Sequence, residues 1–450
     1  MIKIILEEET HIDPFNEPAR ELRVLNKPLW LHQRDILLPY CTEEREPVKA
    51  GDSIEDTDKE TIIYKDNLFF DEPLFRAFIE AAKKRSSPSQ IAFSPNDAAI
   101  VRHAWPLQDG IRLKGDLYVA DLYYYPSGYS SAKEQTLEPL IVDTLSTEMG
   151  YYHIPTYMAT EKGDLVYNVP RRAFLSIENW VHIFLANTTF GLFSMGARIE
   201  ERLNTSFPFL LKILYRSLIE RKQFLQSSPL VTVGKNVQID PAAIVQGPTI
   251  IGDNVTIGAG VVINTCVIGN NVNITQGCQL MLSVVGSGTY LPFRAALFMT
   301  TLMENAMVAQ NTCLQMCVVG RDTFIGAGNT FTDFNILAMP IKTMHKGKLV
   351  DVQQPVIGGC VGHNCRIGSG HIIFPARTIE SDVVLFAKEE RTIIAKNIRF
   401  EDSDHHTHPN EKHIPLYHPT EKEDQVVSRN SGTNSISNTR AKDLPDTIKR

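Results

Sequence analysis

The sequence predicts an α/β region, then a solenoid of short parallel strands, then a disordered polar tail. Aliphatic residues recur every five or six residues between about Val233 and Leu385, which is the spacing of stacked short strands. Upstream, apolar runs typical of strands alternate with helical patterns. From about Phe400 the chain is polar with few aromatic residues. We therefore expect an α/β domain (1–172), a helical linker (173–228), a solenoid (229–395) and a tail (396–450).

The composition limits the functions that these parts can have. The 450 residues are 43% hydrophobic, as in an ordinary globular protein, and carry a formal charge of −7 with Lys and Arg interspersed among acids. We expect no nucleic-acid partner. Seven scattered cysteines without a CxxC pair predict no zinc site, no disulfide framework and a cytoplasmic location. No apolar run approaches the ~18 residues of a membrane span, and the N-terminus lacks a signal-peptide pattern.

The predicted α/β domain contains strand-like runs and one well-capped helix. The runs are Ile2 to Leu6, Ile62 to Tyr64, Leu117 to Tyr125 and Leu140 to Asp143. Asp71, followed by Glu72 and Pro73, predicts a helix start. The apolar residues that follow share one helical face: Leu74, Phe75, Phe78, Ile79 and Ala82.

Two further helices are expected in the linker, one from near Ser176 and one from near Ser206. The second carries an apolar stripe with Lys212, Arg216, Arg221 and Lys222 opposite it. Such a helix either binds a membrane surface or packs its stripe on its own chain. We expect the stripe to cover the first domain or the open end of the solenoid.

The solenoid follows from a strict repeat. Steps of six, six and five residues lead from Ile251 through Ile257 and Ile263 to Ile268, so one coil has 17 residues. Adding 17 repeatedly keeps reaching large apolar residues, up to Val319 and Ile336 on one side. A second inward register, four residues later, holds small or β-branched residues such as Val255 and Val267. This pattern predicts a hexapeptide-repeat left-handed parallel β-helix.

A protruding loop is predicted near the end of the β-helix. Ile336 and Val361 are separated by 25 residues, eight more than one coil, and steps of six resume at Val361. The excess contains Met344-His345-Lys346-Gly347-Lys348, and loops on rigid scaffolds often carry function. An imidazole can serve as a general base near neutral pH. The loop that holds His345 is therefore a candidate functional segment.

The repeat region resembles the left-handed β-helix acyltransferases. Thr343-Met344-His345, a loop and Pro355-Val356-Ile357-Gly358 are similar to the galactoside and maltose O-acetyltransferase branch, although Lys346 stands where proline is usual. The resemblance implies that His345 is the general base, with His363 and His371 in nearby coils as lesser candidate catalytic residues. The implied donor is acetyl-CoA or another acyl-CoA. It also implies a sugar or sugar nucleotide as acceptor and a homotrimer. The His-x4-His pair of the γ-class carbonic anhydrases is absent.

The order of domains resembles the bifunctional nucleotidyltransferase and acetyltransferase enzymes that make UDP-N-acetylglucosamine. Glu17 to Val24 and Lys27-Pro28-Leu29 are similar to the start of a sugar nucleotidyltransferase family. The first glycine of the chain is Gly51, so the glycine-rich phosphate loop is missing, and Mg²⁺ is expected only if this domain is active. Asp116 is expected in a turn. A nucleotidyltransferase with a structural β-helix and a non-catalytic scaffold stay open as alternatives.

One column of apolar residues falls outside the inward registers. Leu282, Met299 and Met316 are 17 residues apart, and Phe298 lies beside them. On an isolated solenoid they would form an exposed apolar strip, which favours a trimer contact. The alternative is a locally irregular coil that turns the methionines inward.

Overall fold

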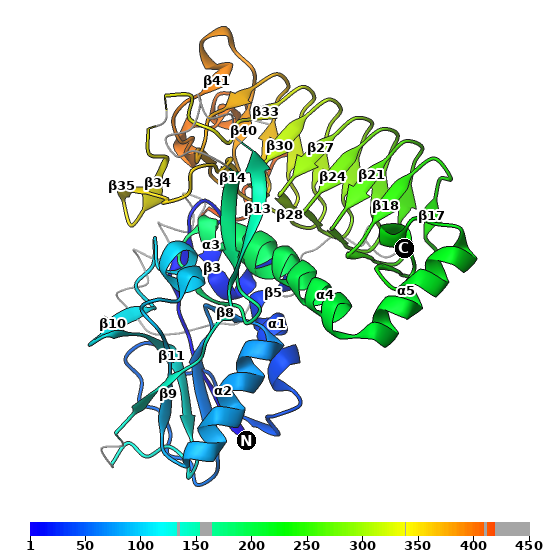
Figure 1. Cartoon of the computed structure of the whole chain (residues 1–450). Helices are drawn as coiled ribbons and strands as arrows, with labels where there is room; N and C mark the ends of the chain where they lie inside the picture. Colours follow the sequence, from blue (N-terminus) through cyan, green and yellow to red (C-terminus); the bar gives the residue numbers. More distant parts are fainter. Residues whose placement is uncertain (133–135, 154–163, 338, 409–411, 419–450) are drawn as a thin grey trace, which may run out of the picture.

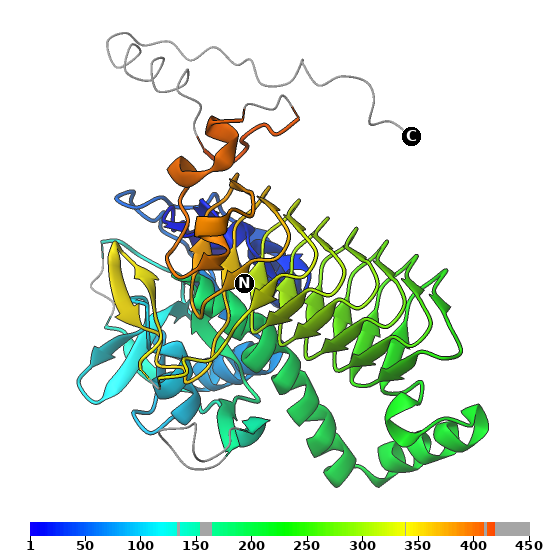
Figure 2. The same ribbon diagram turned by 90° about the horizontal axis from the view of Figure 1, so that it is seen from above.

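The computed structural model describes residues 1–132, 136–153, 164–337, 339–408 and 412–418. An N-terminal α/β region packs beside one end of a long solenoid, and helices α4 (Ser194–Thr205) and α5 (Phe207–Glu220) run towards the other end (Figures 1 and 2). No helix in these ranges is both long and apolar enough to cross a membrane.

A mixed sheet forms the centre of the N-terminal region. Its order is β12-β9-β11-β7-β1-β6, with β10 added to β11, and β11 is antiparallel to both neighbours. The four predicted strands are present as part of it. The bounds are β1 (Ile2–Leu6), β6 (Glu43–Glu44), β7 (Thr61–Lys65), β9 (Ser89–Phe93), β10 (Arg112–Lys114), β11 (Leu117–Tyr125) and β12 (Glu138–Ile141).

Smaller pairs and helices complete this region. The pairs are β2 (His11–Ile12) with β3 (Glu17–Pro18), β4 (Arg23–Val24) with β5 (Lys27–Pro28), β8 (Leu68–Phe70) with β15 (Phe174–Ser176), and β13 (Thr147–His153) with β14 (Asp164–Val169). The helices are α1 (Leu29–Leu37), α2 (Glu72–Arg85), α3 (Trp180–Asn187) and the π-helical turns Ile100–Ala104 and Thr188–Phe193.

The helix predicted after Asp71 is confirmed as α2. The Asp71 carboxylate accepts a hydrogen bond from the Leu74 N–H at 3.0 Å, which satisfies a free donor of the first turn. The five apolar residues predicted to share a face are all buried. Helix α3 begins later than predicted, because Asn179 rather than Ser176 caps it, and every residue of α3 is buried.

Three parallel eight-stranded sheets form the solenoid and confirm the predicted three-sided β-helix. The first contains β16 (Val231–Val233), β19 (Thr249–Ile251), β22 (Val267–Ile268), β25 (Val284–Val285), β28 (Thr301–Leu302), β31 (Val318–Val319), β36 (Cys360–Val361) and β39 (Thr378–Ile379). The second contains β17 (Gln238–Ile239), β20 (Thr256–Ile257), β23 (Asn273–Ile274), β26 (Tyr290–Leu291), β29 (Met307–Val308), β32 (Phe324–Ile325), β37 (Arg366–Ile367) and β40 (Val384–Leu385). The third contains β18 (Ile244–Gln246), β21 (Val262–Asn264), β24 (Gln279–Met281), β27 (Ala296–Phe298), β30 (Cys313–Gln315), β33 (Thr330–Phe331), β38 (Ile372–Ile373) and β41 (Ile393–Ile394).

The buried side chains of the solenoid confirm the first predicted inward register. On one side of the coil, the second register is displaced by one residue. Ile257, Ile274 and Leu291 stack in one buried column, as predicted. After the short five-residue step, Cys266 and Cys317 belong to the inner core, and Val267 is only partly buried. The shorter step moves the inward position back by one residue. The outward neighbours Val284 and Val318 are nevertheless buried, because other parts of the chain cover that face.

One prediction is wrong: the solenoid has no exposed apolar strip formed by Leu282, Met299, Phe298 and Met316. Met299 and Met316 are fully buried in the core of the N-terminal region, and Leu282 and Phe298 pack against the same core. Two apolar surfaces of one chain thus cover each other. The homotrimer remains a prediction, but this column cannot be its exposed contact surface.

The predicted loop leaves the solenoid, but it is longer than predicted. β31 pairs with β36, with Val319 opposite Val361, so the excursion adds 25 residues to a 17-residue coil. Ile336 was expected inside and is instead 81% exposed. Within the excursion, β34 (Lys342–His345) and β35 (Lys348–Asp351) form an antiparallel hairpin.

The boundary of the predicted tail at residue 396 is also wrong. Ile398 bridges to Ile379, and buried Asp404 forms ion pairs with Lys388 and Arg391. Single 3-10 turns lie at Glu389–Arg391, Phe400–Asp402 and Asp404–His406. These contacts close the last coil. Residues 409–411 and 419–450 of the predicted tail lie outside the described residues.

Candidate functional site

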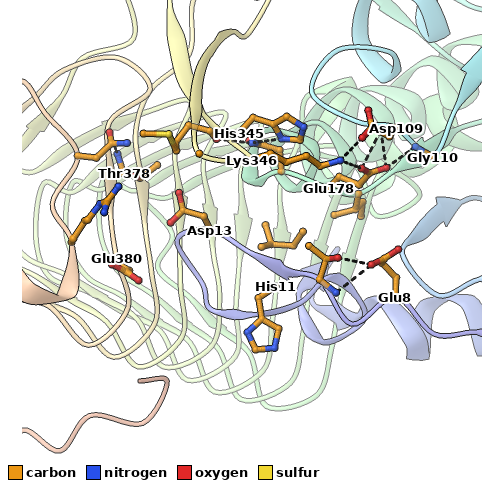
Figure 3. Close-up of a pocket in the computed structure, with 18 of the residues that line it drawn as sticks. Glu8, His11, Asp13, Asp109, Gly110, Glu178, His345, Lys346, Thr378 and Glu380 are labelled. Carbon is orange, nitrogen blue, oxygen red and sulfur yellow. Dashed lines mark hydrogen bonds and ion pairs between the residues drawn. The ribbon is translucent and has the colours of Figure 1, made fainter. Parts of the chain in front are cut away.

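A pocket of about 730 Å³ lies where the N-terminal region, the β34–β35 hairpin and the last coils meet (Figure 3). This volume is in the range of small-molecule sites. Its lining comes from several places in the sequence: the segment after β1, the end of β7, the loops before β10 and α3, the β34–β35 hairpin, and the end of the solenoid. The labelled lining residues are Glu8, His11, Asp13, Asp109, Gly110, Glu178, His345, Lys346, Thr378 and Glu380.

The N-terminal region fixes the hairpin that carries His345. The Trp180 indole N–H donates to Thr343 Oγ1 at 2.9 Å, and Asn179 Nδ2 donates to the Met344 carbonyl at 3.0 Å. Trp180 and Thr343 are fully buried, so the bond between them is shielded from competing water, whereas the Asn179–Met344 bond is partly buried. The protruding loop therefore contacts the N-terminal region of its own chain.

Thr343→Val should loosen this anchor. Valine keeps the volume of threonine but leaves the buried Trp180 N–H without its acceptor, so we expect a loss of about 1–3 kcal/mol in the free energy of unfolding. Urea denaturation followed by fluorescence measures this loss. Thr330→Val, at an exposed solenoid position, is the control and should change stability by less than about 0.5 kcal/mol. Equal stability of both variants would contradict the anchoring role.

Glu178 organises the charges beside the hairpin (Figure 3). Its carboxylate accepts hydrogen bonds from the Gly110 N–H at 2.7 Å and the Asp109 N–H at 3.0 Å. Lys346 pairs with Asp109 and lies 3.5 Å from Glu178 Oε2. The hydrogen bond to Asp109 raises the pKa of Lys346, so the ammonium group stays charged. One cation and two carboxylates thus lie close enough to His345 to influence its charge.

The His345 imidazole is partly exposed to the pocket and tends to be neutral. Partial burial, followed by the nearby charge of Lys346, lowers its pKa from the ordinary value, whereas Glu178 and Asp109 oppose the shift. Its Nδ1 lies 3.5 Å from Asn179 Nδ2, which is too long to fix the tautomer. A neutral imidazole with an accessible lone pair can accept a proton.

His363 and His371 do not line this pocket. His363 is fully buried, with Nε2 3.0 Å from Glu17 Oε1 and Nδ1 accepting from the Arg321 N–H at 2.8 Å. His371 is fully buried as well, and its Nδ1 lies 3.2 Å from the Arg391 carbonyl. Burial lowers the pKa of both. Of the three histidines predicted as catalytic candidates, only His345 lines this pocket.

The pocket lining also contains charged residues that the sequence reasoning missed. Glu8 follows β1 and Lys65 ends β7, with Lys65 Nζ 3.3 Å from Glu8 Oε2 and 3.6 Å from Asp121 Oδ2. Arg112 on β10 also pairs with Asp121. Ligands of α/β sheets often bind at the carboxyl ends of parallel strands, and that rule would have indicated Glu8 and Lys65.

The described residues assemble no group of three His, Cys, Asp or Glu side chains suited to a metal ion. We therefore assign no residue to Mg²⁺. Asp116 lies in the exposed turn between β10 and β11, next to Gly115 with a positive φ of 61°, as the turn prediction expects.

Comparison with known proteins identifies the repeat. Residues 231–265 match the model of bacterial transferase hexapeptide repeats. Among solved structures, UDP-N-acetylglucosamine O-acyltransferase from Moraxella catarrhalis RH4 is 14% identical, covers 35% of this chain and 70% of its own, and has a TM-score of 0.22. A proposed acetyltransferase from Bacillus cereus is 16% identical over 32% of this chain and 76% of its own, with a TM-score of 0.16. No curated protein matches the chain. The chain thus contains hexapeptide repeats in a β-solenoid.

Proposed function

We propose that the protein is an acyltransferase that binds its acceptor in the pocket and uses His345 as general base. The observation that carries this proposal is the placement of His345. The hairpin leaves the solenoid, is held by a buried hydrogen bond, and presents a partly exposed imidazole with a lowered pKa to a pocket of substrate size. The hexapeptide repeat is in keeping with a transferase.

In the proposed reaction, His345 takes the proton from a hydroxyl or amine of the acceptor. The oxygen or nitrogen then attacks the thioester carbonyl of acetyl-CoA or another acyl-CoA. The C–S bond breaks, and the imidazolium gives its proton to the leaving CoA thiolate, which restores the neutral His345. Lys346, which Asp109 and Glu178 hold beside the pocket, favours the neutral imidazole that the first step needs.

The acceptor that we propose is a sugar or sugar nucleotide. Glu178, Glu8 and Asp13 offer hydrogen-bond acceptors for sugar hydroxyls, and Lys65, Arg112 and Arg399 offer cationic groups for a phosphate. A cytoplasmic homotrimer remains part of the proposal. Its contact surface must lie outside the buried Met299 and Met316 column.

The pH dependence of turnover should identify the base. The neutral form is active, so kcat/KM should fall as the pH drops through the pKa of His345, below 6.5. Lys346→Ala removes a nearby cation and should raise this pKa, which moves the acidic limb to higher pH. Glu178→Gln should move the limb to lower pH. Shifts in the same direction, or no shift, would contradict the assignment.

Two alternatives are separated by product analysis. A sugar-1-phosphate nucleotidyltransferase is favoured by the charged cluster of Glu8, Lys65 and Arg112 at the strand ends. It would convert UTP and a sugar 1-phosphate to a UDP-sugar and release pyrophosphate. A non-catalytic scaffold would give neither product.

A thermal-shift screen with acetyl-CoA, UTP and UDP-sugars is the first experiment. A ligand that binds only the folded state raises the melting temperature, by an amount that grows with its concentration over Kd. The proposal expects shifts with acetyl-CoA and with at least one UDP-sugar. A shift with UTP alone would favour the nucleotidyltransferase.

A further inference from the structure

Helix α5 exposes an apolar face that the other described residues leave uncovered. Its only buried residue is Ile213. Four of its exposed hydrophobic residues follow a helical spacing of four, three and four, and two more widen the face. These side chains are Phe207 (73% exposed), Leu211 (54%), Leu214 (50%), Tyr215 (62%), Leu218 (78%) and Ile219 (55%). The expectation that α5 buries its stripe against its own chain is therefore wrong.

Basic side chains border this face. Lys212 and Arg216 lie along one edge of the helix, and Arg221 and Lys222 follow its last residue; all four are exposed. Lys222 lies 3.9 Å from Glu220, whose carboxylate also accepts a hydrogen bond from the Ser228 N–H at 3.0 Å. Within the described ranges, the other three cations form no ion pair.

The position of α5 lets it meet a flat surface. In both views α4 leads away from the N-terminal region and α5 lies at the edge of the molecule, beside the first coils (Figures 1 and 2). After α5, the 3-10 turn Phe224–Gln226 contacts β18 and so attaches the chain to the solenoid. The helix is thus peripheral but attached to the rigid solenoid.

The residue composition of this face indicates a lipid surface rather than another protein as its partner. Lys is usually depleted from the centres of protein–protein interfaces. A face of Leu, Phe and Tyr with Lys and Arg at its edge is instead the pattern of helices that lie in the headgroup region of a bilayer. The chain as a whole has a charge of −7, so attraction to an anionic surface must come from this local cluster.

We propose that α5 docks the protein on an anionic membrane surface, with its apolar face in the lipid interface and its Lys and Arg side chains at the headgroups. This inference is independent of the acyl transfer proposed above. It places the solenoid and its pocket beside the membrane.

Vesicle co-sedimentation of the full chain tests the proposal, with vesicles of phosphatidylcholine alone or mixed with anionic phosphatidylglycerol. The intact protein should bind the anionic vesicles and bind neutral vesicles more weakly. Leu211→Glu with Leu218→Glu should lower the partition coefficient by more than about tenfold, because two exposed leucines can no longer enter the interface. Lys212→Glu with Arg216→Glu should weaken binding mainly to anionic vesicles and remove its salt dependence.

Leu38→Glu is the matched control, because Leu38 is a 70% exposed leucine directly after α1 and is not part of α5. It should bind vesicles like the intact protein. Far-ultraviolet circular dichroism and light scattering check that folding and mass are unchanged in every variant. No binding by the intact protein, or equal binding by the Leu211 and Leu218 variant, would overturn the proposal. A loss of self-association in that variant without lipid would assign the face to a second copy instead.

Discussion

Replacing His345 by alanine should lower the rate of acyl transfer by about 10²- to 10⁴-fold while the fold remains intact. The imidazole is the candidate base at the pocket, and alanine removes it without removing the hydrogen bonds of Thr343 and Met344 that hold the hairpin. The loss should appear in kcat more than in KM, because the proton transfer belongs to the reaction step. Steady-state kinetics with an acyl-CoA and the acceptor found in the ligand screen measure it.

His408→Ala is the control for this variant. His408 is exposed near the end of the described chain and does not line the pocket. The His408→Ala variant should have the same turnover rate and the same melting temperature as the intact protein. If His345→Ala retained full activity, the base would have to be another group, and the proposed role of the hairpin would be lost.

Replacing Met299 and Met316 together by lysine should destabilise the protein severely. Both side chains are fully buried where the solenoid meets the N-terminal region, so two ammonium groups would lose their water without a partner. We expect a loss of more than about 4 kcal/mol, a large part of the ordinary stability of a domain. Thermal melting and denaturant titration measure it.

Two further variants keep this prediction testable if the double lysine variant does not fold. Met299→Ala with Met316→Ala should lower stability by about 2–5 kcal/mol per site, since each truncation leaves a cavity. Met281→Lys, on the same face of the solenoid but 45% exposed, should change stability by less than about 0.5 kcal/mol. A double lysine variant that melts like the intact protein but loses subunits would restore the trimer strip expected from the sequence.

The solenoid could be predicted because its periodicity records local burial. Ile257, Ile274 and Leu291 occupy equivalent positions in successive coils and stack on one another, so the spacing alone places them inside. The same rule failed at Ile336, which lies 17 residues after Val319 by coincidence. Periodicity indicates that a position is apolar, but it cannot tell whether the chain is still in the coil.

Contacts between distant parts of the chain could not be predicted in this way. Met299 and Met316 fall outside the inward registers, and only the packing of the N-terminal region on the solenoid decides whether they meet water. Glu178 belongs to the candidate site for the same reason. It lies 167 positions before His345 in the sequence, and no repeat or motif connects the two. His345 itself could be identified because it interrupts the repeat in a loop.

Transfer of radiolabel from acetyl-CoA to a sugar nucleotide tests the central claim most directly. The intact protein and the His345→Ala variant are incubated with labelled acetyl-CoA and the UDP-sugar that raises the melting temperature, and the products are separated by chromatography. The proposed mechanism predicts label on the sugar with the intact protein and a loss of about 10²-fold or more with the variant. Label transfer at equal rates, or formation of a UDP-sugar from UTP with no acyl transfer, would contradict it.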